Sequence, residues 1–344
     1  MGVGVIRPGG LIAILAAAVV AVAAAAPAQA QTAVKFTLDG RIEGPAAPFL
    51  LALDHGYFKA EDLDVTVEPA GNPAEPLARV ATGGYDIGVG DINALIRWRD
   101  QNPSVPLKAV FIVQNRPSYA IVARKSRGVA EPKDLEGKKL GAPAADPASA
   151  QWPIFAKVNG IDAGKVTVLN VGLPVREPML AAGEVDAITG PSYGAPINLR
   201  QKSVPAEDIV VLLMADYGLE LYGNAIVVNP KFAAEKPEAV KAFLRAYTKA
   251  VKETANDPVN AVLPVIQRNG GGSRDIELER LLIALKQNVL TPEVKANGLG
   301  EIDAARFERG LEQLGLGYTF KTKLKAADVF DDSFLPPEEE RKVV

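Results

Sequence analysis

The sequence predicts an α/β fold made of two similar lobes, followed by a helical C-terminal part. Between residues 34 and 229, short runs rich in β-branched residues alternate with segments of helical periodicity. This alternation is typical of βαβ units and of a mostly parallel sheet. In addition, segments 81–93 and 181–190 share Ala, Gly, Asp and Gly in register, which indicates that one helix–turn–strand unit occurs twice.

Hydrophobic periodicity and turn residues predict the order of the elements. We expect strands at 34–38, 63–67, 85–89, 106–113, 119–123, 139–141, 166–171, 185–189, 209–214 and 224–229. We expect helices at 44–56, 74–82, 91–100, 146–159, 175–182, 192–201, 237–256, 274–289 and 304–314. The last three are amphipathic, and Phe243, Tyr247 and Val251 fall on one apolar stripe of the first of them.

Length and composition limit the possible functions. With 344 residues the chain is long enough for two domains. Its 38 basic and 41 acidic residues leave no basic field that would attract nucleic acid. The chain has no cysteine and a single histidine, His55, which excludes thiol catalysis, disulfides, Cys-type zinc sites and iron–sulfur clusters. We therefore expect no catalytic residues, no metal site and no cofactor.

Residues 1–30 have the pattern of a cleaved signal peptide. Arg7 precedes an apolar run from Leu11 to Ala26, and Ala28-Gln-Ala30 matches the A-x-A cleavage pattern. The alternative, a membrane anchor, needs about 20 apolar residues, and this run is shorter. We therefore expect export to the periplasm.

Several phrases of the sequence are similar to one family. They are 56–65 (GYFKAEDLDV), 77–90, 135–141 (LEGKKLG), 179–189, and 222–229 (YGNAIVVN) followed by 237–243. Together they resemble the periplasmic nitrate/sulfonate/taurine- and thiamine-pyrimidine-binding proteins of ABC importers. Asp62 stands where this family usually has glycine in the turn, and aspartate tolerates the left-handed conformation better than most residues.

The resemblance implies a type II periplasmic-binding-protein fold, with two Rossmann-like lobes joined by two crossover strands. Lobe 1 would comprise 33–122 plus 224–335 with the C-terminal helices, and lobe 2 would comprise 127–215. The hinge would lie near 123–126 and 215–223. A small-molecule solute would bind between the lobes, and the partners would be an inner-membrane ABC permease and its cytoplasmic ATPase. We expect a monomer.

Ligands of open α/β sheets bind beyond the carboxyl ends of the strands, near helix N-termini. Applied to both lobes, this rule gives a set of candidate ligand-binding residues. They are Gly44, Ala46, Asn72, Gly90, Asp91, Asn93, Asn115, Tyr119, Asp146, Ser149, Trp152, Arg176, Glu177, Thr189, Ser192, Tyr193, Asp216 and Tyr222.

Some candidates have a structural alternative. Asp91 can cap a helix instead of touching a ligand, and the same holds for Asp146 and Ser149. Trp152 lies one turn into a helix, where core packing is the alternative. Arg176 either anchors an anion or pairs with a neighbouring carboxylate. We expect Asp86 and Asp186 to be turn residues, and His55 to be an exposed surface residue.

The expected cleft contains more acidic than basic side chains, which favours a solute that donates hydrogen bonds. Asp91, Asp146, Glu177 and Asp216 fall near it, and Trp or Tyr rings stack on flat heterocycles. An aminopyrimidine or another amine-bearing or heteroaromatic compound is therefore favoured over nitrate, an alkanesulfonate or taurine. The alternatives to transport are a periplasmic sensor and a pyrimidine-synthesising enzyme. The resemblance implies that such an enzyme uses its own histidine and a cysteine-rich iron site.

Overall fold

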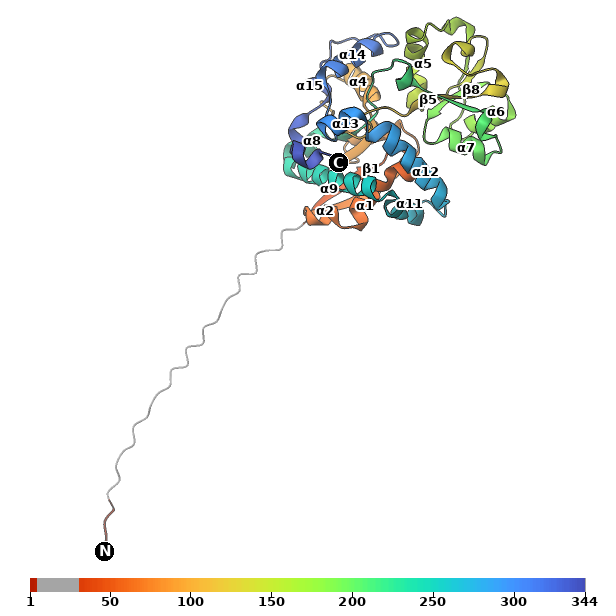
Figure 1. The fold of residues 1–344 in the computed structure, drawn as a ribbon. Helices are drawn as coiled ribbons and strands as arrows, with labels where there is room; N and C mark the ends of the chain where they lie inside the picture. Colours follow the sequence, from red (N-terminus) through yellow and green to blue (C-terminus); the bar gives the residue numbers. More distant parts are fainter. Residues whose placement is uncertain (5–30, 344) are drawn as a thin grey trace. The chain divides into compact units, whose positions relative to one another are not determined.

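Two five-stranded sheets form the framework of the chain (Figure 1). The computed structural model describes residues 1–4 and 31–343, so the expected signal peptide falls almost entirely outside the described residues. The first sheet has the order β2 (Leu63–Glu68), β1 (Thr32–Thr37), β3 (Ile87–Asp91), β10 (Asn224–Val228), β4 (Lys108–Ile112). The second has the order β7 (Thr167–Leu169), β6 (Lys139–Gly141), β8 (Ala187–Pro191), β5 (Tyr119–Arg124), β9 (Ile209–Leu213).

Each sheet contains one antiparallel strand in the fourth position of its order. Strand β10 pairs antiparallel with β3 and β4, and β5 pairs antiparallel with β8 and β9. Both strands follow a segment that leaves the other sheet, namely 113–118 before β5 and 214–223 before β10. We call these segments the first and second crossovers, and we call the part built on each sheet lobe 1 and lobe 2.

The position of β5 corrects the sequence analysis, which placed residues 33–122 in lobe 1 and the first hinge at 123–126. Strand β5 belongs to the second sheet, so the chain crosses before Tyr119 rather than after Ala123. Two apolar runs joined by a short polar link, 114–118, resemble a hairpin within one sheet. Sequence periodicity reports the strands but not the sheet in which each one pairs.

Helices cover both sheets. Those of the N-terminal half are α1 (Ala47–Asp54), α2 (Tyr57–Ala60), α3 (Glu75–Ala81), α4 (Ile92–Gln101), α5 (Pro147–Val158), α6 (Arg176–Ala182) and α7 (Ala195–Gln201). Those of the C-terminal half are α8 (Pro230–Glu235), α9 (Pro237–Asn256), α10 (Pro258–Ala261), α11 (Leu263–Arg268), α12 (Arg274–Ala284), α13 (Pro292–Asn297), α14 (Ala304–Leu314), α15 (Ala326–Val329) and α16 (Glu338–Arg341). Helix α12 continues as a π-helical turn, Leu285–Val289. None of the helices in the described part of the chain is long and apolar enough to span a bilayer.

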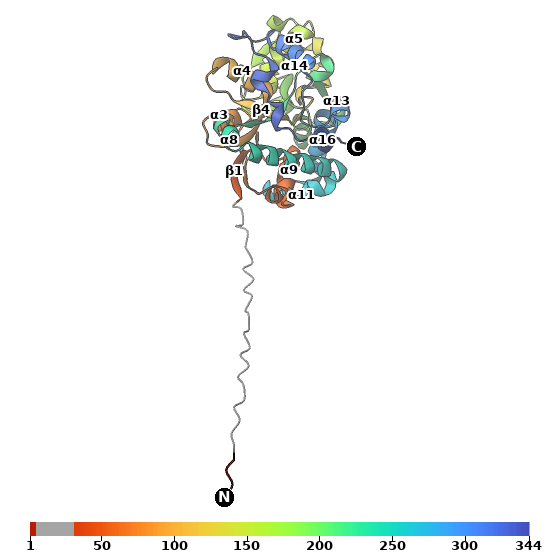
Figure 2. The same cartoon turned by 90° about the vertical axis from the view of Figure 1, so that its left-hand side faces the viewer.

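Helix α9 supplies much of the lobe 1 core, as its apolar stripe predicts. It packs against α1 and α2 and lies across the lobe in Figure 2. Phe243 contacts Phe36 at 5.1 Å and Phe58 at 4.8 Å between ring centroids, and Tyr247 stacks on Phe49 at 4.2 Å. All five rings are at most 3% exposed. At about 1.5–3 kcal/mol per buried large side chain, this cluster anchors β1 and the loop that follows it.

The duplicated turn performs the same structural task in both lobes. The Asp86 carboxylate accepts a hydrogen bond from the Lys35 backbone N–H at 2.8 Å, and the Asp86 N–H donates to the Lys35 carbonyl at 2.9 Å. The Asp186 carboxylate and N–H make the same two bonds to Lys139, both at 2.9 Å. Each aspartate therefore ties the turn to a neighbouring strand of its sheet, β1 for Asp86 and β6 for Asp186. This confirms the expectation that both residues are turn residues.

We predict that Asp86→Ala and Asp186→Ala each lower the free energy of unfolding by about 1–3 kcal/mol, because each removes a charge-assisted hydrogen bond. Urea denaturation of the purified protein measures the change. Asp64→Ala is the control, since Asp64 is exposed and surface substitutions change stability by about 0.5 kcal/mol at most. Equal stability of all three variants would contradict a structural role for the duplicated turn.

Candidate functional site

A cavity of about 550 Å³ lies between the lobes. Lobe 1 lines it with the loop after β1 and with Asn224 at the start of β10, and lobe 2 lines it with the end of β8 and with α6 and α7. The first crossover contributes Gln114 and Ser118. Because β10 and β5 run antiparallel, their first residues meet the carboxyl ends of the parallel strands at this cavity.

Seven of the residues that the sequence analysis selected lie in the cavity wall. They are Ala46, Asn72, Tyr119, Asp146, Arg176, Glu177 and Tyr193. The other eleven lie outside the wall, and most of them take part in contacts that support it. They are Gly44, Gly90, Asp91, Asn93, Asn115, Ser149, Trp152, Thr189, Ser192, Asp216 and Tyr222.

Asp91 and Asn93 connect lobe 1 to the start of β5 and to the second crossover. The Asp91 side chain caps α4 by accepting from the Ala94 N–H at 2.7 Å, and it also accepts from the Tyr119 hydroxyl. The Asn93 amide donates to the Tyr119 hydroxyl at 2.7 Å and to the Tyr222 carbonyl at 2.8 Å. Burial raises the pKa of both Asp91 and Tyr119. The side chains of Asp91, Asn93 and Tyr119 thus use their polar groups in hydrogen bonds within the protein. Of the three residues, only Tyr119 lines the cavity.

Asp146 forms the polar floor of lobe 2. It caps α5, accepts from the Thr189 hydroxyl at 2.8 Å and pairs with Arg176 at 3.3 Å. Ser149 supports Thr189 through a 2.6 Å contact between their hydroxyls. Arg176 also pairs with Glu177 at 3.0 Å. Burial raises the pKa of Asp146, and Arg176 opposes that shift. Arg176 is thus flanked by two carboxylates before any solute arrives.

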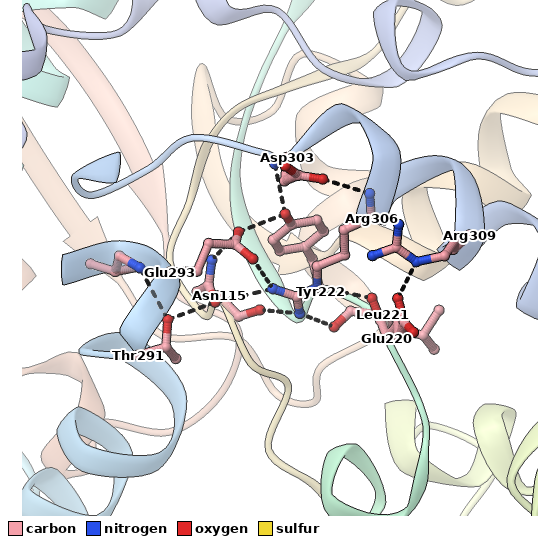
Figure 3. A network of polar contacts seen from close by, with 10 residues as sticks. Asn115, Glu220, Leu221, Tyr222, Thr291, Glu293, Asp303, Arg306 and Arg309 are labelled. Carbon is pink, nitrogen blue, oxygen red and sulfur yellow. Dashed lines mark hydrogen bonds and ion pairs between the residues drawn. The ribbon is translucent and has the colours of Figure 1, made fainter. Parts of the chain in front are cut away.

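Asn115 and Tyr222 belong to a network behind the cavity that joins the two crossovers (Figure 3). At its centre is Arg306 of α14. Its guanidinium donates to the carbonyl of Asn115 at 2.7 Å, of Leu221 at 2.8 Å and of Glu220 at 3.1 Å. It lies 3.9 Å from the centroid of the Tyr222 ring. One side chain therefore holds backbone from both crossovers.

Glu293 of α13 completes this network. It accepts from the Tyr222 hydroxyl at 2.7 Å and from the Asn115 amide at 2.8 Å, and it pairs with Arg306 at 2.9 Å. The C-terminal helices thus hold both crossovers, and α14 also packs against α5 of lobe 2. The sequence analysis assigned Asn115 and Tyr222 to the ligand because their partners, at 293 and 306, are too distant in sequence to be foreseen.

The remaining candidates have packing or surface positions. A side chain at Gly44 would collide with the backbone of Glu277, and one at Gly90 would meet Leu77 at 2.8 Å. Trp152 is 5% exposed and packs in the core. Buried Ser192 bonds to the first crossover through its backbone N–H, and Asp216 pairs with Arg116 at the surface.

The cavity wall also contains polar residues that the sequence analysis missed. They are Asp39, Arg41, Glu43, Gln114, Ser118, Asn198, Gln201, Lys202 and Asn224. Asp39 is the second residue after β1, so the strand-end rule covers it, but the candidates predicted after this strand started at Gly44. Asn224 begins a strand, and only the antiparallel direction of β10 brings it to the cavity.

The fold and the interlobe cavity define a two-lobed binding protein. The model of the NMT1/THI5-like family matches residues 45–261, and the chain belongs to this family. This confirms the family resemblance inferred from the sequence.

Among curated relatives, the riboflavin-binding protein RibY of Chloroflexus aurantiacus is 25% identical over 298 residues, which cover 84% of this chain and 82% of RibY. The formylaminopyrimidine-binding protein of Halalkalibacterium halodurans is 24% identical and covers 69% of this chain and 72% of its own length. A 4-amino-5-hydroxymethyl-2-methylpyrimidine phosphate synthase of Schizosaccharomyces pombe is 24% identical over 220 residues. The match spans only 62% of either chain.

Solved structures have the same fold. The alkanesulfonate-binding protein SsuA of Xanthomonas axonopodis pv. citri superposes with a TM-score of 0.64 at 15% identity, over 88% of this chain and 99% of SsuA. The nitrate-binding protein NrtA of Synechocystis PCC 6803 gives a TM-score of 0.66 at 13% identity, over 88% and 87% of the two chains. The periplasmic-binding-protein fold predicted from the sequence is thereby confirmed.

We predict that Arg306→Lys lowers the free energy of unfolding by about 3 kcal/mol, since a lysine cannot reach three carbonyls and would leave buried partners unpaired. Chemical denaturation measures the loss. Arg309→Lys is a matched control on the same helix, because Arg309 is about half exposed and pairs with Glu220 at the surface. Such an exposed pair contributes about 1 kcal/mol or less. If both variants lost the same stability, Arg306 would not be the residue that holds the two crossovers together.

Proposed function

We propose that this chain is the substrate-binding component of an ABC importer, which captures a small organic solute between its lobes and delivers it to a membrane permease. One observation carries the proposal, namely a cavity of about 550 Å³ lined by polar side chains of both lobes and of the first crossover. Small-molecule sites are concave, about 300–1,000 Å³, and often lie between domains.

The relatives support this role and suggest where the protein acts and with which partners. Two bacterial relatives bind riboflavin or formylaminopyrimidine according to their names. The structures with the same fold include periplasmic binding proteins and components of ABC import systems. We therefore propose a periplasmic location after cleavage of a signal peptide at 1–30, a monomeric state, and a permease with its ATPase as partners.

The charges in the cavity wall favour an amine-bearing or heteroaromatic solute over nitrate, an alkanesulfonate or taurine. The wall contains four carboxylates, those of Asp39, Glu43, Asp146 and Glu177. Its three cations are Arg41, Lys202 and Arg176, of which the first two are exposed and the third is paired with carboxylates. A small oxyanion would meet no unpaired buried cation here, and it would fill little of the volume.

A synthase activity is the alternative suggested by the yeast relatives. We propose binding without turnover, because the one histidine lies away from the cavity. His55 follows α1, its side chain is about half exposed, and it pairs with Glu253 at 3.0 Å. The wall thus contains neither histidine nor cysteine among the described residues.

The lobes also touch where α12 meets α7, whose residues Asn198 and Gln201 line the cavity. Arg280 of α12 donates to the Asn198 side chain of α7 at 2.8 Å, and Arg200 makes two 2.6 Å bonds to Glu279. Helix α12 packs on lobe 1 next to the turn at Gly44, and α7 packs on lobe 2. We propose that these contacts form only when the lobes close, so that they slow the release of the solute.

The binding role predicts that a suitable solute raises the melting temperature of the mature domain. At 100 times Kd a ligand stabilises the folded state by about 2.7 kcal/mol, which a thermal-shift screen detects. The screen would contain aminopyrimidines, riboflavin, amino acids, aromatic carboxylates, alkanesulfonates and nitrate. We expect shifts from aminopyrimidines or flavins and none from nitrate. Product formation from any of these compounds, or a complete lack of shifts, would refute the proposal.

The closure contacts predict that Arg280→Lys speeds dissociation of the solute found in that screen. Losing a charge-assisted hydrogen bond of about 1.5–3 kcal/mol weakens affinity about 10- to 100-fold. Glu279→Gln should change affinity about fivefold at most, because its exposed ion pair is worth about 1 kcal/mol or less. Stopped-flow measurements separate the rates. An unchanged dissociation rate in Arg280→Lys would show that α12 does not hold the closed form.

A further inference from the structure

We propose that Asp39 determines which solutes bind, by accepting a hydrogen bond from an N–H donor group, such as a ring amino group, on the solute. The inference rests on the proposed binding function and names the residue and the chemical group that would decide specificity. It depends on the position of Asp39, on its lack of a cationic partner and on its neighbours.

Asp39 is the second residue after β1 and lies in the cavity wall. Its Oδ2 accepts from the side-chain amide of Asn224 at 2.5 Å. Within residues 31–343, no other side chain donates to the Asp39 carboxylate, and no Lys or Arg lies within 4.0 Å of it. Arg41, two residues further on, is exposed. Asp39 therefore has an oxygen available to a molecule in the cavity.

The other carboxylates of the wall are better compensated. Asp146 and Glu177 both pair with Arg176. Glu43 lies 3.8 Å from the guanidinium of Arg280. Asp39 alone among these four wall residues has no cation. A charged group enclosed by protein is costly unless it is paired and hydrogen-bonded. A hydrogen-bond donor on the solute would therefore provide the partner that the Asp39 carboxylate lacks within the protein.

The electrostatic environment agrees with this geometry. Burial raises the pKa of Asp39, and the nearby Glu43 adds to the effect. The ionised form of Asp39 is therefore disfavoured in the unliganded fold. The loss of folding stability that ionisation causes grows as the pH rises through the raised pKa. The substitution Asp39→Asn keeps the shape and one acceptor for Asn224 but removes the charge, so it should relieve this cost.

An aromatic neighbour extends the inference to the shape of the solute. Tyr193 of lobe 2 also lines the cavity. Burial raises the pKa of its hydroxyl, and the charges of Asp39 and Glu43, which line the same cavity, raise it further. A flat ring with an amino substituent would stack on Tyr193 while it donates to Asp39.

The test compares two probes, 4-amino-5-hydroxymethyl-2-methylpyrimidine and the same ring with a methyl group in place of the amino group. Isothermal titration calorimetry on the mature wild-type protein should show at least tenfold tighter binding of the amino compound, since a hydrogen bond to a charged group is worth that factor or more. Wild-type protein that binds both probes equally, or prefers the methyl compound, would overturn the inference without any variant.

Asp39→Asn is the decisive variant. We expect it to weaken binding of the amino compound at least tenfold, to leave the methyl compound within about twofold, and to melt at or above the wild-type temperature when unliganded. Asp86→Asn, a carboxylate of the same lobe that binds backbone outside the cavity, should show the reverse, with a lower melting temperature and unchanged affinity. Equal affinity of Asp39→Asn and wild type for the amino compound would also refute the role of Asp39.

These outcomes separate the two proposals. If neither probe nor any solute of the wider screen binds the wild-type protein, the binding function itself fails and the inference fails with it. If solutes bind but only those without an N–H donor do, the binding function stands and the role of Asp39 is wrong.

Discussion

The exchange of one antiparallel strand into each sheet is the constraint on which the rest of the structure depends. Strands β5 and β10 are each paired on both sides inside a sheet, so both ends of each crossover are held by strands. Because β5 and β10 run against their neighbours, their first residues arrive at the carboxyl ends of the parallel strands, and the cavity forms where the sheets and crossovers meet.

The crossovers contain buried backbone carbonyls that lie outside both sheets and therefore need hydrogen-bond donors from side chains. This need explains the polar clusters around Arg306 and Asn93. Arg306 satisfies carbonyls of both crossovers, and Asn93 satisfies the carbonyl of Tyr222. An unpaired buried carbonyl costs about 1–3 kcal/mol, so the C-terminal helix that carries Arg306 stabilises both crossovers. The residues near the cavity therefore divide into those that hold the crossovers and those that line the cavity wall.

Sequence reasoning could predict the elements because they depend on local pattern, as the apolar stripe of α9 and the paired turns at Asp86 and Asp186 show. It could also bring Asp146 and Arg176 to the cavity, since both lie at strand ends or helix starts. It could not separate Asp91 from Asp39. Both are aspartates at the end of a strand, and only the fold places Tyr119 against the first and leaves the second without a cation. The sequence pattern likewise could not predict which sheet β5 joins, because strand pairing depends on contacts between residues far apart in the sequence.

The difference between Asp91 and Asp39 also shows how a binding site and a stable fold make opposite demands on the same kind of group. Burial raises the pKa of both, but Asp91 is held by a helix N-terminus and a tyrosine hydroxyl, which offset the cost within the protein. Asp39 has one amide partner, so part of the cost remains until a donor enters the cavity. If the fold satisfied every carboxylate of the site as fully as it satisfies Asp91, the protein would be more stable. The site would then have no free acceptor for a solute. Specificity between the lobes therefore resides where the fold leaves a polar group incompletely satisfied.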